Sequence, residues 1–220
     1  MIAIKGKLID TVSSLCESPY TDPAKTITQK LETWFPDLSS WLDKCAGILR
    51  LSPRYGSESQ KEEALWRILI FDTTAPQGLR TPDESYAESY KAYRQLIDLE
   101  LNIQRFSSYA KFAIVKESWS RRRVLYNDQS QVYQISMTNF MRGRQFCSSK
   151  SGYIGWAPSN AQLGDKVCFF QGYPIPFVLR PTNDKHSVDF QLIGEAYIHG
   201  MMNGETADLN DASPEIIRLV

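Results

Sequence analysis

The sequence predicts an α+β fold, with a helical N-terminal half and a small antiparallel β-sheet or barrel in the C-terminal half. Apolar residues recur at helical spacings of three and four through most of the first 115 residues. After about residue 143 the pattern changes to short runs of aromatic and β-branched residues that are separated by turn residues. A chain of 220 residues is also long enough to bury a core of its own.

This change in periodicity divides the chain into three predicted regions. Residues 1–128 form a mainly helical region, residues 129–205 form a short helix and the small β-sheet or barrel, and residues 206–220 form a tail. The first boundary follows a stretch over residues 116–128 with few apolar residues, as expected of an exposed connection. Within the tail, Ser213-Pro214-Glu215 predicts the start of a final helical turn.

The chain begins with one short strand and two helices. Alternating apolar residues predict a strand at residues 2–4, which has no earlier strand to pair with. Asp22 followed by Pro23 is a helix start signal, because the carboxylate can accept a bond from a free amide and proline suits the first turn. That helix is expected to end at Pro36, and an amphipathic helix follows over residues 38–49.

Three more helices are predicted before the strands. A Ser-x-x-Glu capping box begins a helix over residues 59–71 that is apolar on more than one face. The sequence Thr81-Pro82-Asp83-Glu84 combines an N-cap, a first-turn proline and a capping glutamate, and helical spacing then continues to about Val115. A short helix is predicted over residues 131–141, with Gly143 as its C-terminal stop.

Five short strands with tight turns are predicted in the C-terminal half. They cover about residues 144–148, 153–157, 166–171, 175–180 and 186–198. Gly152 and Gly164 suit turns with positive φ. Gly155 and Gly194 suit a bulge or a close backbone approach inside a strand. Such a run of strands closes into a small barrel or packs one face of a sheet on neighbouring helices.

Charged residues in the strand-rich half have structural interpretations. Asp165 is expected to cap its own turn, since aspartate side chains commonly accept backbone amide bonds in turns. Arg180 and Glu195 are expected to form a cross-strand ion pair.

Composition argues against several functional classes. The 25 basic and 25 acidic residues cancel, so the chain has no net field that would attract nucleic acid or an anionic membrane. No apolar run is long enough to span a bilayer and the first residues lack a signal-peptide pattern, so we expect a cytoplasmic protein. Cys16, Cys45, Cys147 and Cys168 lie in apolar segments, which predicts buried free thiols. With two histidines, no Cys-x-x-Cys and no phosphate-loop spacing, we expect no metal and no cofactor.

Two alternative functions remain open. A cysteine-dependent hydrolase would use Cys147 as nucleophile, with His199 or His186 as base and Asp165 or Asp189 as orienting acid. No nucleophile elbow surrounds Cys147, and its place within a predicted strand favours packing.

The second alternative is a small β-barrel module that binds nucleic acid through Arg121, Arg122 and Arg123. Further residues that would extend this surface are Lys116, Tyr126, Tyr133, Arg142 and Arg144. A solvated connection explains the same run of arginines, and the neutral net charge provides no steering toward nucleic acid.

Four segments of the C-terminal half form a specific joint pattern. They read RQFCSSKSGYIGWAP at 144–158, GDKV at 164–167, PFVLR at 176–180 and GEAYIHGMMNGE at 194–205. In this order they closely resemble the region that follows the HET domain in fungal heterokaryon-incompatibility proteins, and EALWRILIFD at 63–72 is similar to that region too. Asn203 departs from the pattern, because the family often has an acidic residue there.

The resemblance implies a non-catalytic accessory or regulatory region that acts through protein contacts in non-self recognition or cell-death control. Its partner would be a HET domain or another fungal protein. The phrases typical of the HET domain do not occur in this sequence, so the strand at residues 2–4 is expected to pair with that missing domain. The motif residues available for such contacts are Gly155, Trp156, Gly164, Asp165, Arg180, Glu195, Tyr197, His199, Gly200 and Glu205.

Overall fold

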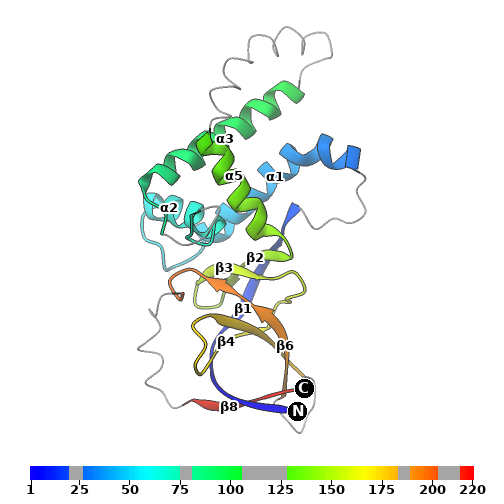
Figure 1. Ribbon diagram of the computed structural model, residues 1–220, viewed down its shortest axis with the longest axis vertical. Helices are drawn as coiled ribbons and strands as arrows, with labels where there is room; N and C mark the ends of the chain where they lie inside the picture. Colours follow the sequence, from blue (N-terminus) through cyan, green and yellow to red (C-terminus); the bar gives the residue numbers. More distant parts are fainter. Residues whose placement is uncertain (20–26, 75–80, 106–127, 183–188, 203–213) are drawn as a thin grey trace. The chain divides into compact units, whose positions relative to one another are not determined.

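The computed structural model describes residues 1–19, 27–74, 81–105, 128–182, 189–202 and 214–220. The chain divides into two compact units, each of which gathers segments that are distant in the sequence. The barrel unit consists of Met1–Ser18, Cys45–Ala64 and Gly143–Val220, and the helical unit consists of Pro19–Lys44 and Leu65–Arg142. All the described strands belong to the barrel unit (Figure 1).

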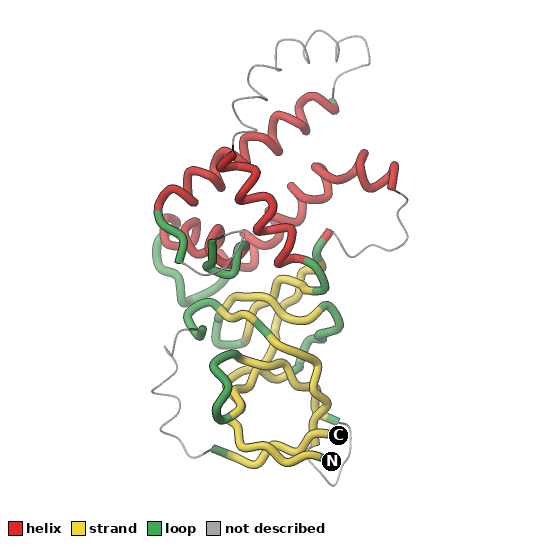
Figure 2. The backbone as a smooth tube through the Cα atoms, in the orientation of Figure 1, coloured by secondary structure: helices red, strands yellow, loops and turns green. Residues whose placement is uncertain are grey.

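The strands of the barrel unit form one mixed sheet. They are β1 (Ile2–Glu17), β2 (Arg144–Ser149), β3 (Ile154–Pro158), β4 (Lys166–Phe170), β5 (Pro176–Pro181), β6 (Asp189–Glu195), β7 (Tyr197–Ile198) and β8 (Glu215–Leu219). Hydrogen-bonded neighbours follow the order β4-β5-β6-β8-β1-β2-β3-β7, and β4 also pairs with β1. This additional pairing closes a ring of β1, β4, β5, β6 and β8, which Figure 2 shows as a circle of strands.

Strand β1 takes part in both the ring and the sheet beside it. Its 16 residues pair antiparallel with β8 first, then with β4, and finally with β2. The register shifts between Leu8 and Asp10 and again between Val12 and Ser14. Because such irregularities bend a strand and increase its twist, β1 can leave the ring and continue as a member of the sheet β1-β2-β3-β7.

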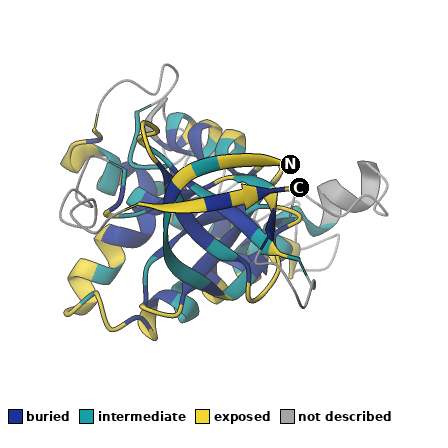
Figure 3. Ribbon diagram, turned by 90° about the horizontal axis from the view of Figure 1, so that it is seen from below, coloured by how far each residue is buried: buried dark blue, intermediate teal, exposed yellow. Residues whose placement is uncertain are grey.

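The ring encloses an apolar core to which each of its strands contributes. The side chains are Ile4 and Leu8 of β1, Cys168 and Phe170 of β4, Phe177 and Leu179 of β5, Phe190 of β6, and Ile217 and Leu219 of β8. Val167 and Val178 alternate with these residues along β4 and β5 and pack in a second cluster. Both faces of β4 and β5 are therefore buried. The two chain ends lie side by side, since Ile2 pairs with Leu219 (Figure 3).

The helical unit has a core of aromatic side chains. It contains α3 (Glu84–Gln104), α5 (Asp128–Met141) and parts of α1 (Ile27–Arg50) and α2 (Glu58–Leu69). Tyr133 of α5 is fully buried, its ring lies 5.4 Å from that of Tyr90 and 6.0 Å from that of Tyr93, and its hydroxyl donates to the Trp66 carbonyl at 2.9 Å. This one hydroxyl thereby joins α5 to α2 within the aromatic core.

The predicted fold class is wrong. The chain begins with β1, its helices occupy the middle of the sequence, and its eight-stranded sheet includes a parallel pair, β6 with β8. Local periodicity revealed the individual elements but carried no information about pairing over long separations, such as that of Val12 with Ser149. The compact units accordingly do not follow the linear division at residues 1–128, 129–205 and 206–220.

Both chain ends differ from their predictions. The strand predicted at residues 2–4 extends to Glu17 and pairs with β8, β4 and β2, so its partners lie in this chain and not in a missing domain. The predicted tail supplies β8 at Glu215–Leu219 in place of a helical turn. Alternating burial of Ile217 and Leu219 in the ring favours the extended conformation over the helix.

Helix α1 continues through Pro36, where the sequence predicted its end. An internal proline removes one backbone hydrogen bond and costs about 3 kcal/mol. Leu38, Trp41 and Leu42 are almost completely buried, and their burial contributes a comparable or larger stabilisation. The start signal predicted at Asp22 and Pro23 lies outside the described residues.

Two helix starts use different capping residues from those predicted. Ser57 and Gln60 form the capping box of α2: the Gln60 amide donates to Ser57 Oγ at 3.1 Å, and the Ser57 amide donates to Gln60 Oε1 at 3.0 Å. Asp83 caps α3 by accepting from the Ser85 amide at 3.0 Å, in place of Thr81. The predicted extension of this helix to Val115 lies outside the described residues.

Other local predictions are confirmed. Strands β2, β3, β4 and β5 match the predicted runs within one residue at each end, β6 and β7 lie inside the run at 186–198, and α5 contains the helix predicted over 131–141. Gly152 and Gly164 have positive φ values of 83° and 94°. Gly194 lies where the register between β5 and β6 shifts, as expected of a bulge.

Gly155 provides the predicted close backbone approach. It pairs with Cys147 of β2 on one side and with Ile198 of β7 on the other. A Cβ atom at this position would overlap the Tyr197 carbonyl and lie 2.9 Å from the Cα atom of Ile198. Because these atoms belong to the backbone of β7, they cannot move aside without breaking the strand pairing.

We expect Gly155→Ala to lower the free energy of unfolding by about 3 kcal/mol, since the added methyl group forces β3 and β7 apart. Gly47→Ala is the matched control: a Cβ there meets nothing within 4 Å, and alanine in a helix is expected to stabilise by about 0.5–1 kcal/mol. Urea denaturation measures both changes. A Gly155→Ala protein as stable as the unmodified chain would contradict the close approach.

Candidate functional site

The buried carboxylate of Asp165, in the GDKV segment, forms an ion pair with the partly exposed Arg180, in the PFVLR segment. Only 2% of Asp165 is exposed, and its two carboxylate oxygens accept from Arg180 Nε and Nη2, each at 3.0 Å. Its Oδ2 also accepts from the Gln162 amide at 2.8 Å, which confirms the predicted turn cap. Hydrogen bonding to Asp165 raises the pKa of Arg180. The ion pair with the guanidinium offsets the free-energy cost of removing the Asp165 carboxylate from water.

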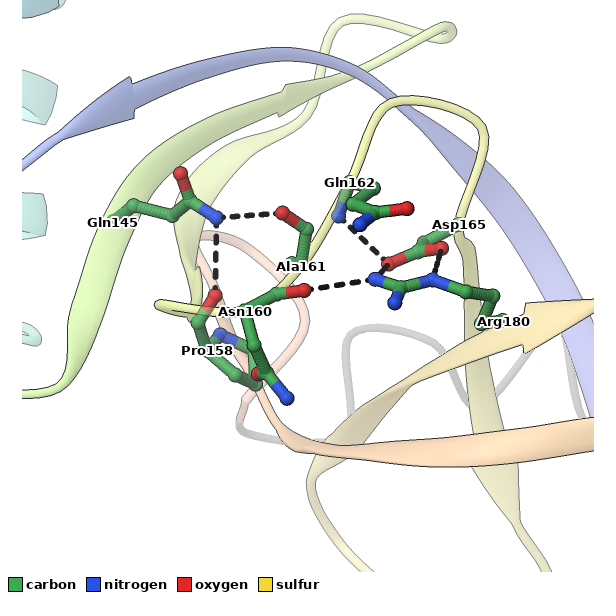
Figure 4. A network of polar contacts seen from close by, with 7 residues as sticks. All are labelled: Gln145, Pro158, Asn160, Ala161, Gln162, Asp165 and Arg180. Carbon is green, nitrogen blue, oxygen red and sulfur yellow. Dashed lines mark hydrogen bonds and ion pairs between the residues drawn. The ribbon is translucent and has the colours of Figure 1, made fainter.

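The same network fixes the loop that joins β3 to β4 (Figure 4). Arg180 Nη2 donates to the Asn160 carbonyl at 2.8 Å. On the other side of the loop, Gln145 Nε2 lies 2.8 Å from the Ala161 carbonyl and 3.2 Å from the carbonyls of Pro158 and Ser159. The loop over residues 158–165, called the β3–β4 loop below, is thus held on one side by the buried Gln145 and on the other by the partly exposed Arg180.

The β3–β4 loop combines fixed backbone with exposed side chains. Its end is anchored to β1, because the Gly164 amide donates to the Val12 carbonyl at 3.0 Å and the Val12 amide donates to the Asp165 carbonyl at 2.8 Å. Leu163 is 66% exposed, and Ser159, Asn160 and Gln162 are exposed beside it. An apolar side chain is therefore presented to solvent on a segment whose conformation is already set.

Trp156 and Tyr197 belong mainly to the scaffold. Trp156 is fully buried and meets Phe146 edge-on, with the ring centroids 5.8 Å apart. Tyr197 is 4% exposed, and its hydroxyl lies 3.1 Å from Nδ1 of His199. His199 in turn stacks on Tyr55 at a centroid distance of 6.2 Å. Burial raises the pKa of Tyr55 to about 12, with a weaker opposing effect from Arg54.

The segment at residues 52–55 packs on the turn between β2 and β3. Ser52 Oγ donates to the Gly152 carbonyl at 2.6 Å, and Arg54 Nε donates to the Ser151 carbonyl at 3.2 Å. The Arg54 guanidinium lies over the Tyr153 ring at 3.4 Å from its centroid. These contacts join segments that lie about a hundred positions apart in the sequence. They also place Tyr55 where it stacks on His199.

Other predicted site residues have different surroundings. The predicted Arg180–Glu195 pair is wrong, because Arg180 binds Asp165, whereas the Glu195 carbonyl accepts from Arg144 Nη1 at 3.0 Å. Gly200 follows β7 with a φ of 77°. Residues that lie outside the described part of the chain are Lys116, Arg121, Arg122, Arg123, Tyr126, His186 and Glu205. A basic surface built on the three consecutive arginines therefore stays a prediction.

Cys147 has the surroundings of a packing residue. It is 2% exposed in the second core cluster, and burial raises the pKa of its thiol to about 12, with a weaker opposing effect of the Gly155 backbone. A cysteine nucleophile needs a populated thiolate at neutral pH, which this environment disfavours. Asp165 and Asp189, the acids available to a triad, bind Arg180 and Arg218. All four cysteines are buried and free, as predicted.

The described residues contain no group of three or more His, Cys, Asp or Glu side chains that could hold a metal ion. Within the same residues, no helix has the length and apolar character that a membrane-spanning segment needs.

The Het-6 beta-barrel domain family matches residues 1–214, a range that includes β1 to β7. This chain belongs to the Het-6 β-barrel domain family. Heterokaryon incompatibility protein 6, OR allele, from Neurospora crassa is 27% identical over 224 residues, which cover 94% of the chain and 32% of that protein. The Het-6 barrel chain thus spans about a third of the length of this curated relative. No solved structure matches it significantly.

Three features of the Het-6 barrel site were absent from the sequence prediction. Gln145 was overlooked. A polar residue inside a buried strand is itself a signal, because its side chain needs hydrogen-bond partners in the interior. The contacts of Arg54 with Ser151 and Tyr153 carry no local signal. The ion pair of Asp189 with Arg218 depends on β8, whose strand conformation was not predicted.

Arg180→Ala is expected to lower the free energy of unfolding by about 2–3 kcal/mol, because it leaves the Asp165 carboxylate buried without its cation. The matched control is Arg94→Ala, which removes a 3.4 Å ion pair to the exposed Asp43 and should change stability by less than about 0.5 kcal/mol. Denaturant titration compares the two variants. Equal effects would show that the Asp165 pair does not hold the β3–β4 loop.

Burial of the Cys147 thiol makes the stability of the Het-6 barrel depend on pH. Above pH 9 the unfolded chain releases this proton while the folded chain keeps it, so the free energy of unfolding falls as the pH rises from 9 toward 12. Cys147→Ala should reduce that slope by up to about 1.4 kcal/mol per pH unit. Val167→Ala, which opens a cavity in the same cluster without a titrating group, should leave the slope unchanged. Unfolding curves recorded at pH 9 and 10 measure this slope for each variant. A slope in Cys147→Ala equal to that of the unmodified chain would refute the buried thiol.

Proposed function

We propose that this Het-6 barrel is a non-catalytic region of a fungal heterokaryon-incompatibility protein, that it follows a HET domain, and that it acts in the cytoplasm by binding protein. Its role would be in non-self recognition or in the control of cell death. The observation that carries the proposal is the family match over residues 1–214, together with the similarity to a Neurospora protein named for heterokaryon incompatibility.

The chemistry of the motif residues supports a non-catalytic role. Asp165 and Arg180 neutralise one another, and Trp156 and Gly155 build the strand core. The Cys147 thiol is buried and its raised pKa keeps it protonated at neutral pH. The motif residues with described contacts thus have structural uses that account for their presence without a reaction.

The β3–β4 loop is the surface that we assign to protein contacts. Binding surfaces are commonly loops on a rigid scaffold, and a loop already fixed in its bound conformation loses less entropy on association. The Asp165–Arg180 pair and Gln145 supply that rigidity. Leu163, with 66% of its surface exposed, supplies an apolar side chain that a partner can bury.

A direct binding measurement tests both the partner and the surface. The probe is the remaining two thirds of the Neurospora relative, expressed as a separate tagged chain, and surface plasmon resonance measures its affinity for the full-length Het-6 barrel chain. We expect saturable binding that Leu163→Asp weakens by about tenfold or more, because a charge replaces a buried apolar contact.

Leu51→Asp is the matched control, since Leu51 is 86% exposed and lies in the same unit but outside the β3–β4 loop. Neither substitution should change stability by more than about 0.5 kcal/mol, because both side chains are exposed. Absence of binding by the unmodified chain would overturn the assigned partner. Equal losses in the two variants would overturn the assignment of the loop.

A further inference from the structure

Strand β8 fills the position between β1 and β6 and thereby completes the ring. It pairs antiparallel with Ile2–Gly6 of β1 along its whole length and parallel with Asp189 and Phe190 of β6. The Val220 amide adds a bond of 3.0 Å to the Phe190 carbonyl. Without β8, the backbone groups that β1 and β6 direct toward it would lose these partners, and an exposed pair of edges would be open to another strand.

The position between β1 and β6 selects a particular kind of strand. Ile217 and Leu219 point into the ring core, where they are 2% and 9% exposed. Between them, Arg218 Nε donates to Asp189 Oδ1 at 2.6 Å, and the Asp189 side chain is 9% exposed. A strand without a cation at this place would leave the Asp189 carboxylate buried without its ion-pair partner. The required sequence is therefore apolar, basic, apolar.

Strand β8 and its receiving edges come from different segments of the chain. The family match ends at residue 214, and β8 begins at Glu215. The receiving edges, β1 and β6, both lie inside the match. When fully extended, a chain of 11 residues, the number from 203 to 213 that precede β8, can span at most about 40 Å. This length is several times the spacing of about 5 Å between neighbouring strands.

We propose that the position between β1 and β6 is a strand-binding site that also accepts β8 of a second copy of this chain, giving a dimer in which the two copies exchange β8. Every second copy carries the required apolar-basic-apolar strand, so the exchanged dimer recovers the pairing with β1, the Arg218–Asp189 bond and the burial of Ile217 and Leu219. The contacts of β8 described above are the same in the closed monomer and in the dimer, and protein concentration then decides the balance.

Disulfide trapping in the full-length chain tests the exchange. Lys5 and Ile216 lie opposite one another, and both are exposed. The Lys5 carbonyl accepts from the Gln171 amide on the β4 side, which makes Lys5 and Ile216 a non-hydrogen-bonded pair with Cα atoms about 4.5 Å apart, close enough for a disulfide. The native cysteines are buried and do not compete.

Two differently tagged chains, one with Lys5→Cys and one with Ile216→Cys, are unfolded together, refolded at high concentration and oxidised with glutathione disulfide. We expect a mixed disulfide between the two tags whose yield rises with protein concentration. Lys7→Cys mixed with Ile216→Cys is the register control, because Lys7 pairs with Phe169 of β4, and it should give no such product.

The double variant Lys5→Cys/Ile216→Cys reports whether β8 pairs with β1 as described. If it forms its internal disulfide while the mixed chains give no intermolecular product, the exchange is refuted. Equal yields from the Lys5 and Lys7 mixtures would mean random collision and would refute it too. The result does not depend on the proposed partner of the β3–β4 loop, because no other protein is present.

Discussion

The barrel unit depends on the pairing of one strand, β1, with three others in succession. Its first residues join β8, its middle residues join β4, and its last residues join β2. The change of partner occurs at register irregularities, and Val12 at the second of them bonds to the backbone of Gly164 and Asp165. The ring, the neighbouring sheet and the β3–β4 loop therefore share one element, and a change in the register of β1 would disturb all of them.

A buried carboxylate bound to arginine occurs twice in this unit, each time at a place where an irregular or terminal segment must be fixed. Asp165 with Arg180 fixes the β3–β4 loop, and Asp189 with Arg218 fixes β8. Such pairs contribute little net stability when both partners are present, because removing the carboxylate from water offsets much of the attraction. Their larger effect is on specificity, since an alternative position of the loop or strand would leave a buried carboxylate without its arginine.

The motifs that marked the chain as a relative of heterokaryon-incompatibility proteins are mainly scaffold. Gly155 permits the approach of β7, Trp156 fills the core, and Asp165 orders a turn. The strands and turns around them were predicted almost to the residue, because alternating burial and glycine at positive φ leave a local signal. The partners of these residues were predicted less well. The sequence predicted that Arg180 pairs with Glu195, whereas it binds Asp165, and Gln145 was overlooked.

The sequence by itself determined the positions of the strands from β2 to β7, most of the helices, the burial of the cysteines and the family. Each of these depends on residues close together in the chain or on a pattern of residue types. Only the tertiary structure decided that β1 and β8 meet, that five strands close a ring and that α1 passes through Pro36. These features arise from burial and backbone pairing between segments far apart in the sequence, where the energy of distant contacts outweighs local preference.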